Sequence, residues 1–305
     1  MKPRDLAELC LLAAIWGASF LFMRVGAGQF GPLALVWVRV AGAALVLLPI
    51  LALRGEFPAM AQHWKTIAIV GLTNSALPFV LFSYAVLTIT GSLASVFNAA
   101  TPLFGALIGW LWLKNGLTTS RVIGLVIGFA GVLGLAWNRA SFKADADSIN
   151  ATLAVAACLL AALSYGYSAN YTKKHAAGVP PMALAAGSQV SATAALALPA
   201  WLAWPTTPLG TSAWVAAIAL AVVCTGLAYI LYFRLIANAG ASNALAVTFL
   251  VPAFAVVWGA LFLAERPTAE MLAGCAVILI GTALATGLLP RTRAVPKPAL
   301  NDVKG

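Results

Sequence analysis

The sequence predicts an all-α membrane protein of ten transmembrane helices, arranged as two inverted five-helix repeats. Three observations predict this fold. Of the 305 residues, 62% are hydrophobic and 9% are charged, whereas about 25% of residues are charged in soluble domains. Uncharged stretches are long enough for pairs of membrane crossings. The second half of the chain also repeats the pattern of the first half at an offset of 150 positions.

Uncharged stretches mark the crossings, because a helix needs about 20 mostly apolar residues to cross a bilayer. Thr66 to Leu113 contains no Asp, Glu, Lys, Arg or His, and neither does Ala176 to Phe233. Buried helices of a soluble protein are the alternative, but no soluble core could cover so many helices that are apolar on all sides. With Gly, Pro and charge as boundaries, the predicted spans are residues 6 to 25, 32 to 53, 66 to 88, 92 to 113, 119 to 138, 150 to 171, 180 to 203, 212 to 235, 242 to 263 and 268 to 289.

Basic residues predict how these helices are oriented, because Lys and Arg in short loops mark the cytoplasmic side. With the N-terminus inside, 13 of the 18 lysines and arginines lie in cytoplasmic segments, four lie outside, and Arg39 lies within a span. We therefore expect a multi-pass protein of the bacterial inner membrane with both termini in the cytoplasm. Residues 291 to 305 are expected to form a disordered basic cytoplasmic tail near the lipid headgroups.

An internal repeat divides the chain into residues 1 to 143 and residues 144 to 290. Coincident prolines and glycines are more informative than matches of Leu or Ala, because each has a backbone role. With five spans in each half, the second copy starts on the opposite face, so the repeats are inverted, as in many secondary transporters. The matching pairs include Pro49 and Pro199, Trp64 and Trp214, Pro102 and Pro252, Gly109 and Gly259, Thr118 and Thr268, Gly124 and Gly274, and Gly131 and Gly281.

Several residues within this pattern resemble a known family. A Trp-Gly pair at Trp16, Arg39 in the second span, and a proline followed by a glycine-containing run into Glu265 together resemble the EamA-type branch of the drug/metabolite transporter superfamily. The resemblance covers roughly residues 6 to 289 and implies export of small metabolites, often amino acids. In that family the proline-to-glutamate signature often occurs in both halves, whereas Asn115 stands here where the first glutamate would be.

Arg39 is the sharpest candidate for a binding residue, because a polar side chain facing hydrocarbon has no partner. It lies about 10 Å inside the second span at 1.5 Å per residue, and no carboxylate lies at similar depth. Its expected partners are backbone carbonyls, water or an anionic group of a substrate. The alternative is an arginine that snorkels outward or caps a neighbouring helix. Gln189 occupies the equivalent position in the second half, which favours an inward face for both.

Polar, proline and aromatic residues on other spans complete the predicted substrate-binding site. Asn98 and Thr248 each lie four residues before a proline. Those prolines, Pro102 and Pro252, are predicted to be helix-breaking and to free carbonyls for a ligand or water. Close packing of helices through small residues is the alternative for this stripe. Side chains with an apolar body and a polar tip can hold an amphipathic ligand, and the remaining candidates are Trp16, Asn74, Phe79, Tyr84, Tyr165 and Tyr229.

Residues and motifs that the sequence lacks restrict the possible transport mechanisms and ligands. No Asp or Glu lies inside a predicted span between residues 9 and 264, and a proton-coupled antiporter usually needs an intramembrane titratable group. We therefore expect facilitated or exchange transport. The four cysteines show no metal or redox spacing, so no metal or cofactor is expected. The net charge of +10 is spread between apolar runs, without the continuous basic patch of a protein that binds nucleic acid.

Two glycine series predict how helices pack. Gly124, Gly128 and Gly131 in the first half, and Gly274 and Gly281 in the second, are expected to form packing seams. A monomer is expected, with a homodimer through these seams as the alternative.

Export of neutral or amphipathic metabolites, above all amino acids, is the function that these features favour. The small-molecule substrate would be held at its polar end by Arg39 or Gln189 and along its side chain by the aromatic rings. Efflux of drug-like or cationic compounds is the first alternative, but it would be favoured by an intramembrane Glu. A membrane-embedded enzyme is the alternative from another class; no HExxH, GxSxG or intramembrane carboxylate pair occurs, so a non-enzyme is expected.

Overall fold

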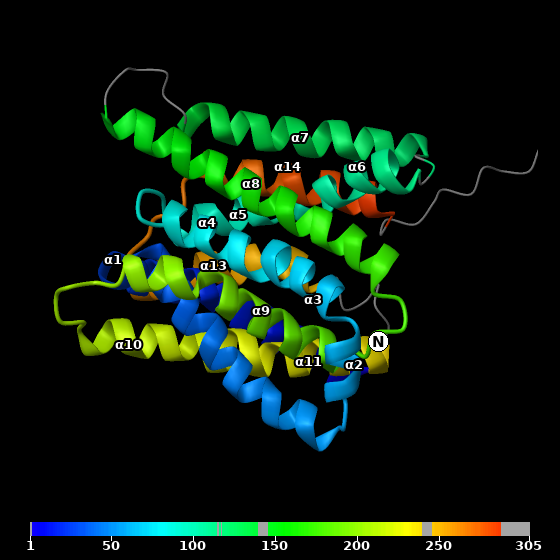
Figure 1. Cartoon of the computed structure of the whole chain (residues 1–305). Helices are drawn as coiled ribbons and strands as arrows, with labels where there is room; N and C mark the ends of the chain where they lie inside the picture. Colours follow the sequence, from blue (N-terminus) through cyan, green and yellow to red (C-terminus); the bar gives the residue numbers. More distant parts are fainter. Residues whose placement is uncertain (1, 115, 117, 140–145, 240–245, 288–305) are drawn as a thin grey trace, which may run out of the picture.

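The protein is a bundle of long apolar helices, seen in a computed structural model that describes residues 2–114, 116, 118–139, 146–239 and 246–287. Every element within these residues is helical. Eight of their helical segments are long and apolar enough to cross a membrane, and α13 (Val247–Leu263) is a shorter apolar helix. The N-terminus and the end of α14 (Ala269–Thr286) lie at one end of the bundle (Figure 1). We call this the N-terminal end and the opposite one the far end.

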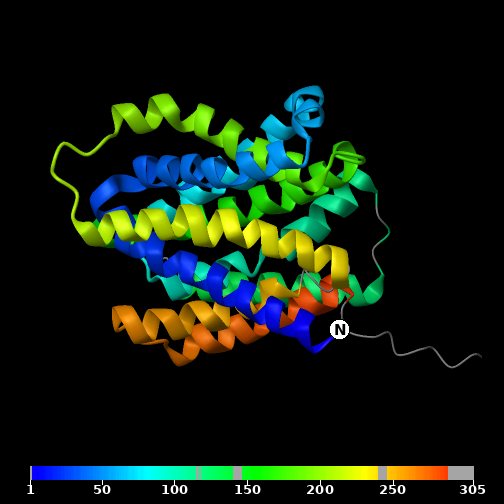
Figure 2. The ribbon, with the colours of Figure 1, turned by 90° about the horizontal axis from the view of Figure 1, so that it is seen from below.

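The first two predicted spans form one element, α1 (Pro3–Leu53), which is broken at Gly31. Gly31 has φ 72° and ψ 160°, a conformation that an L-residue with a side chain rarely adopts. Residues 3–30 form a first limb that runs to the far end, and residues 32–53 form a second limb that returns beside it (Figures 1 and 2). The limbs pack closely, because a Cβ atom added to Gly26 would lie 2.7 Å from Leu35.

The third predicted span, residues 66 to 88, differs from the structure. It consists of α3 (Trp64–Gly71), the π-helix η1 (Leu72–Ala76) and α4 (Leu77–Ala85), and the short helix α2 (Phe57–Gln62) precedes it. The fourth span is divided into α5 (Gly91–Asn98) and α6 (Thr101–Leu113). Thr90 directly precedes α5, and its side chain caps the helix by accepting a hydrogen bond from the backbone N–H of Leu93.

The rest of the chain follows the predicted spans more closely. One span contains a second π-helix, and the start of the predicted span 242 to 263 lies outside the described residues. The elements are α7 (Thr119–Arg139), α8 (Ala146–His175), α9 (Pro181–Leu202), α10 (Thr211–Ile218), the π-helix η2 (Ala219–Leu227), α11 (Ala228–Ala239), α13 and α14.

Glycines join α7 to α14 at a tight seam, as the sequence predicted. A Cβ atom on Gly281 would lie 2.3 Å from the backbone nitrogen of Gly128, and one on Gly124 would lie 2.4 Å from that of Ala285. These distances are shorter than any real contact, so the two backbones approach as closely as glycine allows. The seam is therefore filled within a single chain.

Candidate functional site

A cavity of about 280 Å³ lies inside the bundle and is enclosed by residues from both halves of the chain. Both limbs of α1, η1, η2 and helices α4, α5, α6, α8, α11 and α13 contribute to its wall. Its lining residues are Trp16, Ser19, Phe20, Met23, Arg39, Asn74, Phe79, Phe82, Asn98, Thr101, Tyr165, Ala169, Cys224, Thr225, Tyr229, Tyr232, Val247, Thr248 and Val251.

Arg39, on the second limb of α1, is part of this wall and is only 4% exposed. Its Nε donates a hydrogen bond to the hydroxyl of Thr225 (3.0 Å), and its Nη1 lies 3.7 Å from the sulfur of Met23. Its Cζ atom lies 3.5 Å from the centre of the Phe79 ring, which is a cation–π contact. The side chain therefore points into the protein, and the alternative of an arginine that snorkels outward is wrong.

Thr225 fixes the guanidinium from η2. Its hydroxyl donates to the carbonyl of Leu220 (2.8 Å), so the oxygen presents a lone pair to Arg39. A π-helix has hydrogen bonds between residues five apart instead of four, which changes the carbonyls that accept them, and such helices are frequent at functional sites. η1 borders the cavity in the same way and carries Asn74, whose amide donates to the hydroxyl of Tyr229 (3.2 Å).

Aromatic rings form the apolar part of the wall. Trp16 and Tyr232 have ring centroids 5.3 Å apart. Phe82 lies edge-on to Phe20 at 5.5 Å and stacks with Tyr165 at 6.2 Å. Rings in these arrangements offer a rigid apolar surface. With one guanidinium and a few polar tips among them, they suit a ligand that has a charged or polar end and an apolar body.

The helix break between α5 and α6 lies at the cavity wall. Asn98 ends α5, Pro102 lies in the first turn of α6, and the hydroxyl of Thr101 contacts Asn98 Oδ1 at 3.4 Å. Pro252, also predicted to be helix-breaking, differs, because α13 continues through it. Proline costs a helix one internal donor but leaves φ in the helical range, so the chain can continue where packing supports it.

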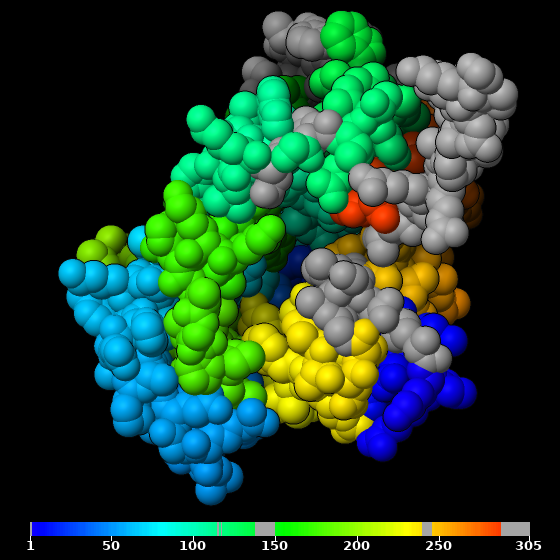
Figure 3. Space-filling model, turned by 90° about the vertical axis from the view of Figure 1, so that its right-hand side faces the viewer, coloured from blue at the N-terminus to red at the C-terminus, as the bar shows by residue number. Residues whose placement is uncertain are grey.

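The two ends of the bundle differ around the cavity. Figure 3 looks onto the N-terminal end, where the surface is hollowed between α8 (green) and α11 (yellow), with α1 (dark blue) visible in the depth. At the far end Glu265, between α13 and α14, accepts hydrogen bonds from the N–H groups of Gly91 and Ser92 (2.9 and 3.1 Å). Arg24 also donates to the carbonyl of Val86 there. These bonds tie the segment between α13 and α14 to α5, and the first limb of α1 to the residue that follows α4.

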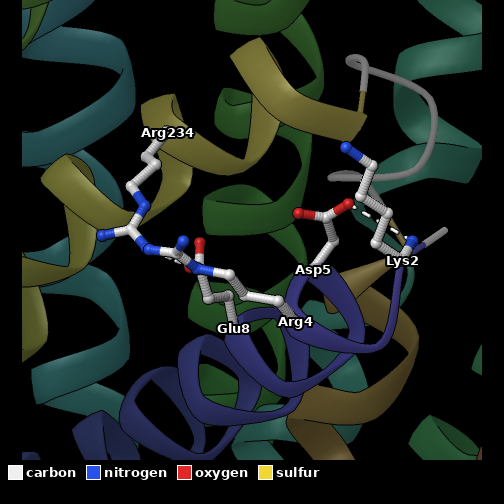
Figure 4. A network of polar contacts seen from close by, with 5 residues as sticks. All are labelled: Lys2, Arg4, Asp5, Glu8 and Arg234. Atoms are coloured by element: carbon white, nitrogen blue, oxygen red, sulfur yellow. Dashed lines mark hydrogen bonds and ion pairs between the residues drawn. The ribbon is translucent and has the colours of Figure 1, made fainter.

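An ion pair links the two halves at the N-terminal end. Glu8 of α1 lies between Arg4, at 3.2 Å, and Arg234 of α11 (Figure 4). Asp5 accepts a hydrogen bond from the backbone N–H of Lys2 nearby. Arg4 and Arg234 are largely exposed, with side-chain accessibilities of 74% and 43%, so water screens this pair.

Eight of the ten predicted substrate-binding residues line the cavity: Trp16, Arg39, Asn74, Phe79, Asn98, Tyr165, Tyr229 and Thr248. Tyr84 does not, because it is 37% exposed on another face of α4. Gln189 also lies outside the lining. It is fully buried behind the wall, where its amide donates to the hydroxyls of Ser75 (2.9 Å) and Ser188 (3.2 Å).

Several lining residues were not predicted. Ser19, Phe20 and Met23 follow Trp16 at helical steps of three or four, and Phe82 follows Phe79 by three, so the face of each helix was readable from the periodicity. Thr225 and Tyr232 are different, because the sequence alone groups them with Tyr229 on one face of the predicted span 212 to 235, and all three line the cavity. Cys224 and Val247 carried no such signal, because they are small or apolar residues in apolar runs.

Arg39 is the single charged residue among the side chains that line the cavity. Among the described residues, both ion pairs lie elsewhere, and no group of three or more His, Cys, Asp or Glu residues could hold a metal ion. The cavity is therefore an apolar and aromatic site with one positive pole.

Comparison with known proteins agrees with this architecture. The model of the EamA-like transporter family matches residues 7–137 and 152–287. The chain is 24% identical to the uncharacterized transporter YvbV of Bacillus subtilis, over 93% of this chain and 92% of that protein. It is also 24% identical to a probable terminal-alkyne amino-acid exporter of Streptantibioticus cattleyicolor, over 90% and 91%. One crystal structure matches with a TM-score of 0.64 at 21% identity, covering 94% of this chain and 98% of that one.

Proposed function

Because this chain belongs to the EamA-like transporter family, we propose that it exports small amphipathic metabolites, with amino acids and their derivatives as the favoured class. The single observation that carries the proposal is the cavity, in which Arg39 of the first half is held by Thr225 of the second half amid a wall of aromatic rings. A relative of similar length is named as a probable amino-acid exporter. Membership of this transporter family also supports transport without an enzymatic step.

The ends of α6 and α13 support the division into two copies of one unit, residues 1 to 143 and 144 to 290. Lys114 and Ala264, 150 positions apart, both have a φ of 52°, and their N–H groups donate to the carbonyls of Gly109 and Gly259. Among the described residues they are the only two with positive φ that are not glycine. An uncommon backbone conformation at two equivalent positions is difficult to attribute to chance.

The π-helices support the same repeat. Shifted by 150 positions, η1 falls on residues 222–226, which lie inside η2. π-Helices are rare in proteins as a whole. Both halves therefore share an unusual element at the same place, and both elements line the cavity.

Ten crossings and an inverted arrangement complete the proposed topology. Ten crossings result when the two limbs of α1 are counted separately and α13 is included with the other candidate spans. The first limb of α1 starts at the N-terminal end, whereas α8 starts at the far end (Figure 1). With the basic residues concentrated at the N-terminal end, that end faces the cytoplasm of a bacterial inner membrane. The predicted basic tail, residues 291 to 305, lies outside the described residues.

This orientation makes the described state inward-facing. The hollow in Figure 3 would open to the cytoplasm, and the Glu265 contacts would close the path to the outside. Rocking of the two halves would open the far end and deliver the substrate. A monomer contains all of these parts.

Efflux of cationic compounds is the runner-up, and the charge of the cavity argues against it. Arg39 would repel a cation, and no carboxylate is present among the lining residues to attract one.

Counterflow in proteoliposomes tests the proposed function. Vesicles are preloaded with a mixed pool of unlabelled amino acids and N-acetyl amino acids, and single labelled members are added outside. We expect transient accumulation of members with apolar or aromatic side chains, and none in protein-free vesicles. Failure of every member of the pool to exchange would contradict the proposal.

A further inference from the structure

The charge balance of the cavity is uneven. Its lining contains one guanidinium and no Asp, Glu, Lys or His. The sequence of residues 240–245, which precedes α13, carries no charged residue either. Two carboxylates near the ends of the bundle are already engaged, since Glu8 pairs with Arg4 and Arg234, and Glu265 bonds to the start of α5.

The neighbours of Arg39 orient its charge without neutralising it. Thr225, Met23 and Phe79 are all neutral, and the two hydrogen bonds use Nε and Nη1 of a group that has five N–H donors. Buried charges in proteins are normally paired with an opposite charge. The guanidinium is therefore held rigidly, at the wall of a cavity, in a form suited to pair with a carboxylate in bidentate geometry.

We propose, building on the function proposed above, that the substrate's carboxylate supplies this opposite charge and that the transported species is a monoanion. An amphipathic carboxylic acid whose nitrogen is uncharged, such as an N-acylated amino acid with an aromatic or branched side chain, fits the site. The ammonium group of a zwitterion meets no carboxylate in the lining and is repelled by Arg39. A cation lacks the required group altogether.

A consequence follows for the driving force. The lining residues include no carboxylate or imidazole that could carry a proton with the substrate, so each cycle moves one negative charge. Export of an anion from a negative cytoplasm is favoured by the membrane potential. The equilibrium ratio of a monoanion changes about tenfold for each ~59 mV, which provides concentrative export without proton coupling.

Four labelled derivatives of phenylalanine with different charges show how transport depends on the charge of the substrate. N-acetyl-L-phenylalanine is an anion, L-phenylalanine is a zwitterion, N-acetyl-L-phenylalaninamide is neutral, and L-phenylalaninamide is a cation. Counterflow of each is measured with the full-length protein in proteoliposomes, with protein-free vesicles as the control for leakage. We expect the anion to be fastest, the zwitterion at least about tenfold slower, and the two amides slower still.

The potential is then imposed with valinomycin and a tenfold potassium gradient directed inward, which makes the vesicle interior positive. N-acetyl-L-phenylalanine is expected to accumulate about tenfold inside, and reversal of the gradient is expected to exclude it to the same extent. Accumulation of L-phenylalanine is expected to be unaffected, because the zwitterion carries no net charge.

Two variants assign the selectivity to Arg39. Arg39→Gln is expected to lose the preference for the anion, so that N-acetyl-L-phenylalaninamide is transported at least as fast as N-acetyl-L-phenylalanine. Arg54→Gln is the matched control, because Arg54 is exposed at the end of the same element, and its preference should be that of the wild type. If Arg39→Gln does not fold, the four-probe counterflow and the imposed potential, both measured on the wild-type protein, still test the inference.

Distinct outcomes separate this inference from the proposed function. Equal transport of the anion and the neutral amide, or accumulation of the anion that ignores the potential, would overturn the inference and leave the proposed function intact. Exchange of other amino acids, with no transport of any of the four probes, would likewise overturn the inference and leave the proposed function intact. If neither the amino-acid pool nor any of the four probes shows counterflow, both the inference and the proposed function are contradicted.

Discussion

The hydroxyl of Ser92 lies 2.5 Å from Oε2 of Glu265, a hydrogen bond that joins the start of α5 to the segment between α13 and α14. The same carboxylate accepts from two backbone N–H groups of α5, so it caps a helix that belongs to the other half of the chain. Carboxylates at helix N-termini are stabilised by the helix dipole. Gly259 provides the space, because a Cβ atom there would lie 2.5 Å from both side chains.

Removing the charge of Glu265 should weaken the closure of the far end. Hydrogen bonds to charged groups contribute about 1.5–3 kcal/mol each, so Glu265→Gln is expected to raise the population open to the far end by about tenfold or more. The measurement is the rate at which a cavity cysteine, Ser19→Cys, reacts with an impermeant thiol reagent added from that side, in a background without the native cysteines.

Glu270→Gln is the control for this experiment. Glu270 lies only five residues further along, in the exposed first turn of α14, and its loss should leave the labelling rate unchanged. Equal rates in the two variants would show that the Glu265 contact does not hold the far end closed.

The seam between α7 and α14 should be intolerant of a single methyl group. Gly281→Ala would place its Cβ atom 2.3 Å from the backbone of Gly128, which forces the two helices apart. Overpacking of this kind costs about 1–3 kcal/mol, and thermal unfolding in detergent should show a lower Tm.

Gly134 offers a matched substitution on α7, because a Cβ atom there would meet nothing within 4 Å. Alanine is favoured over glycine inside a helix by about 0.5–1 kcal/mol, so Gly134→Ala should be neutral or slightly stabilising. A Gly281→Ala protein as stable as Gly134→Ala would mean that the close approach of the helices is not required.

The hydroxyl of Tyr229 should matter for transport apart from its ring. Tyr229→Phe removes the group that accepts a hydrogen bond from Asn74 and keeps the aromatic wall. A neutral hydrogen bond contributes about 0.5–1.5 kcal/mol, so substrate affinity is expected to fall about two- to tenfold, as a higher KM for counterflow. Tyr84→Phe, outside the cavity, should transport normally, and the same loss in both variants would argue against a local role for Tyr229.

Much of the fold and most of the candidate site could be predicted from the sequence, for identifiable physical reasons. Long apolar runs reveal helices because hydrocarbon demands them, and Arg39 stands out because a charge in such a run needs a partner. Phe79 and Tyr84 were both predicted to line the site, but five residues at 3.6 per turn rotate the side chain by about 140°, and Tyr84 lies outside the cavity.

Other features depend on contacts that no run of residues reveals. The π-helices insert a residue without changing composition, so η1 and η2 left no trace in the apolar pattern. Gln189 matches Arg39 in register, but its shorter side chain ends on Ser75 behind the wall. The hydrogen bonds of Glu265 were also not readable from the sequence, because its partners Gly91 and Ser92 are distant in sequence and bond partly through the backbone.

The central claim is that the two halves have opposite orientations in the membrane. Labelling of single cysteines in intact cells tests it most directly. In a background without the four native cysteines, Lys2→Cys and Asn150→Cys mark the beginnings of the two repeats, and Asn150 is exposed. Our account predicts that an impermeant thiol reagent added outside reacts at position 150 and reaches position 2 only after the membrane is opened. Reaction of both positions from the same side would contradict the inverted repeat and the transport pathway built on it.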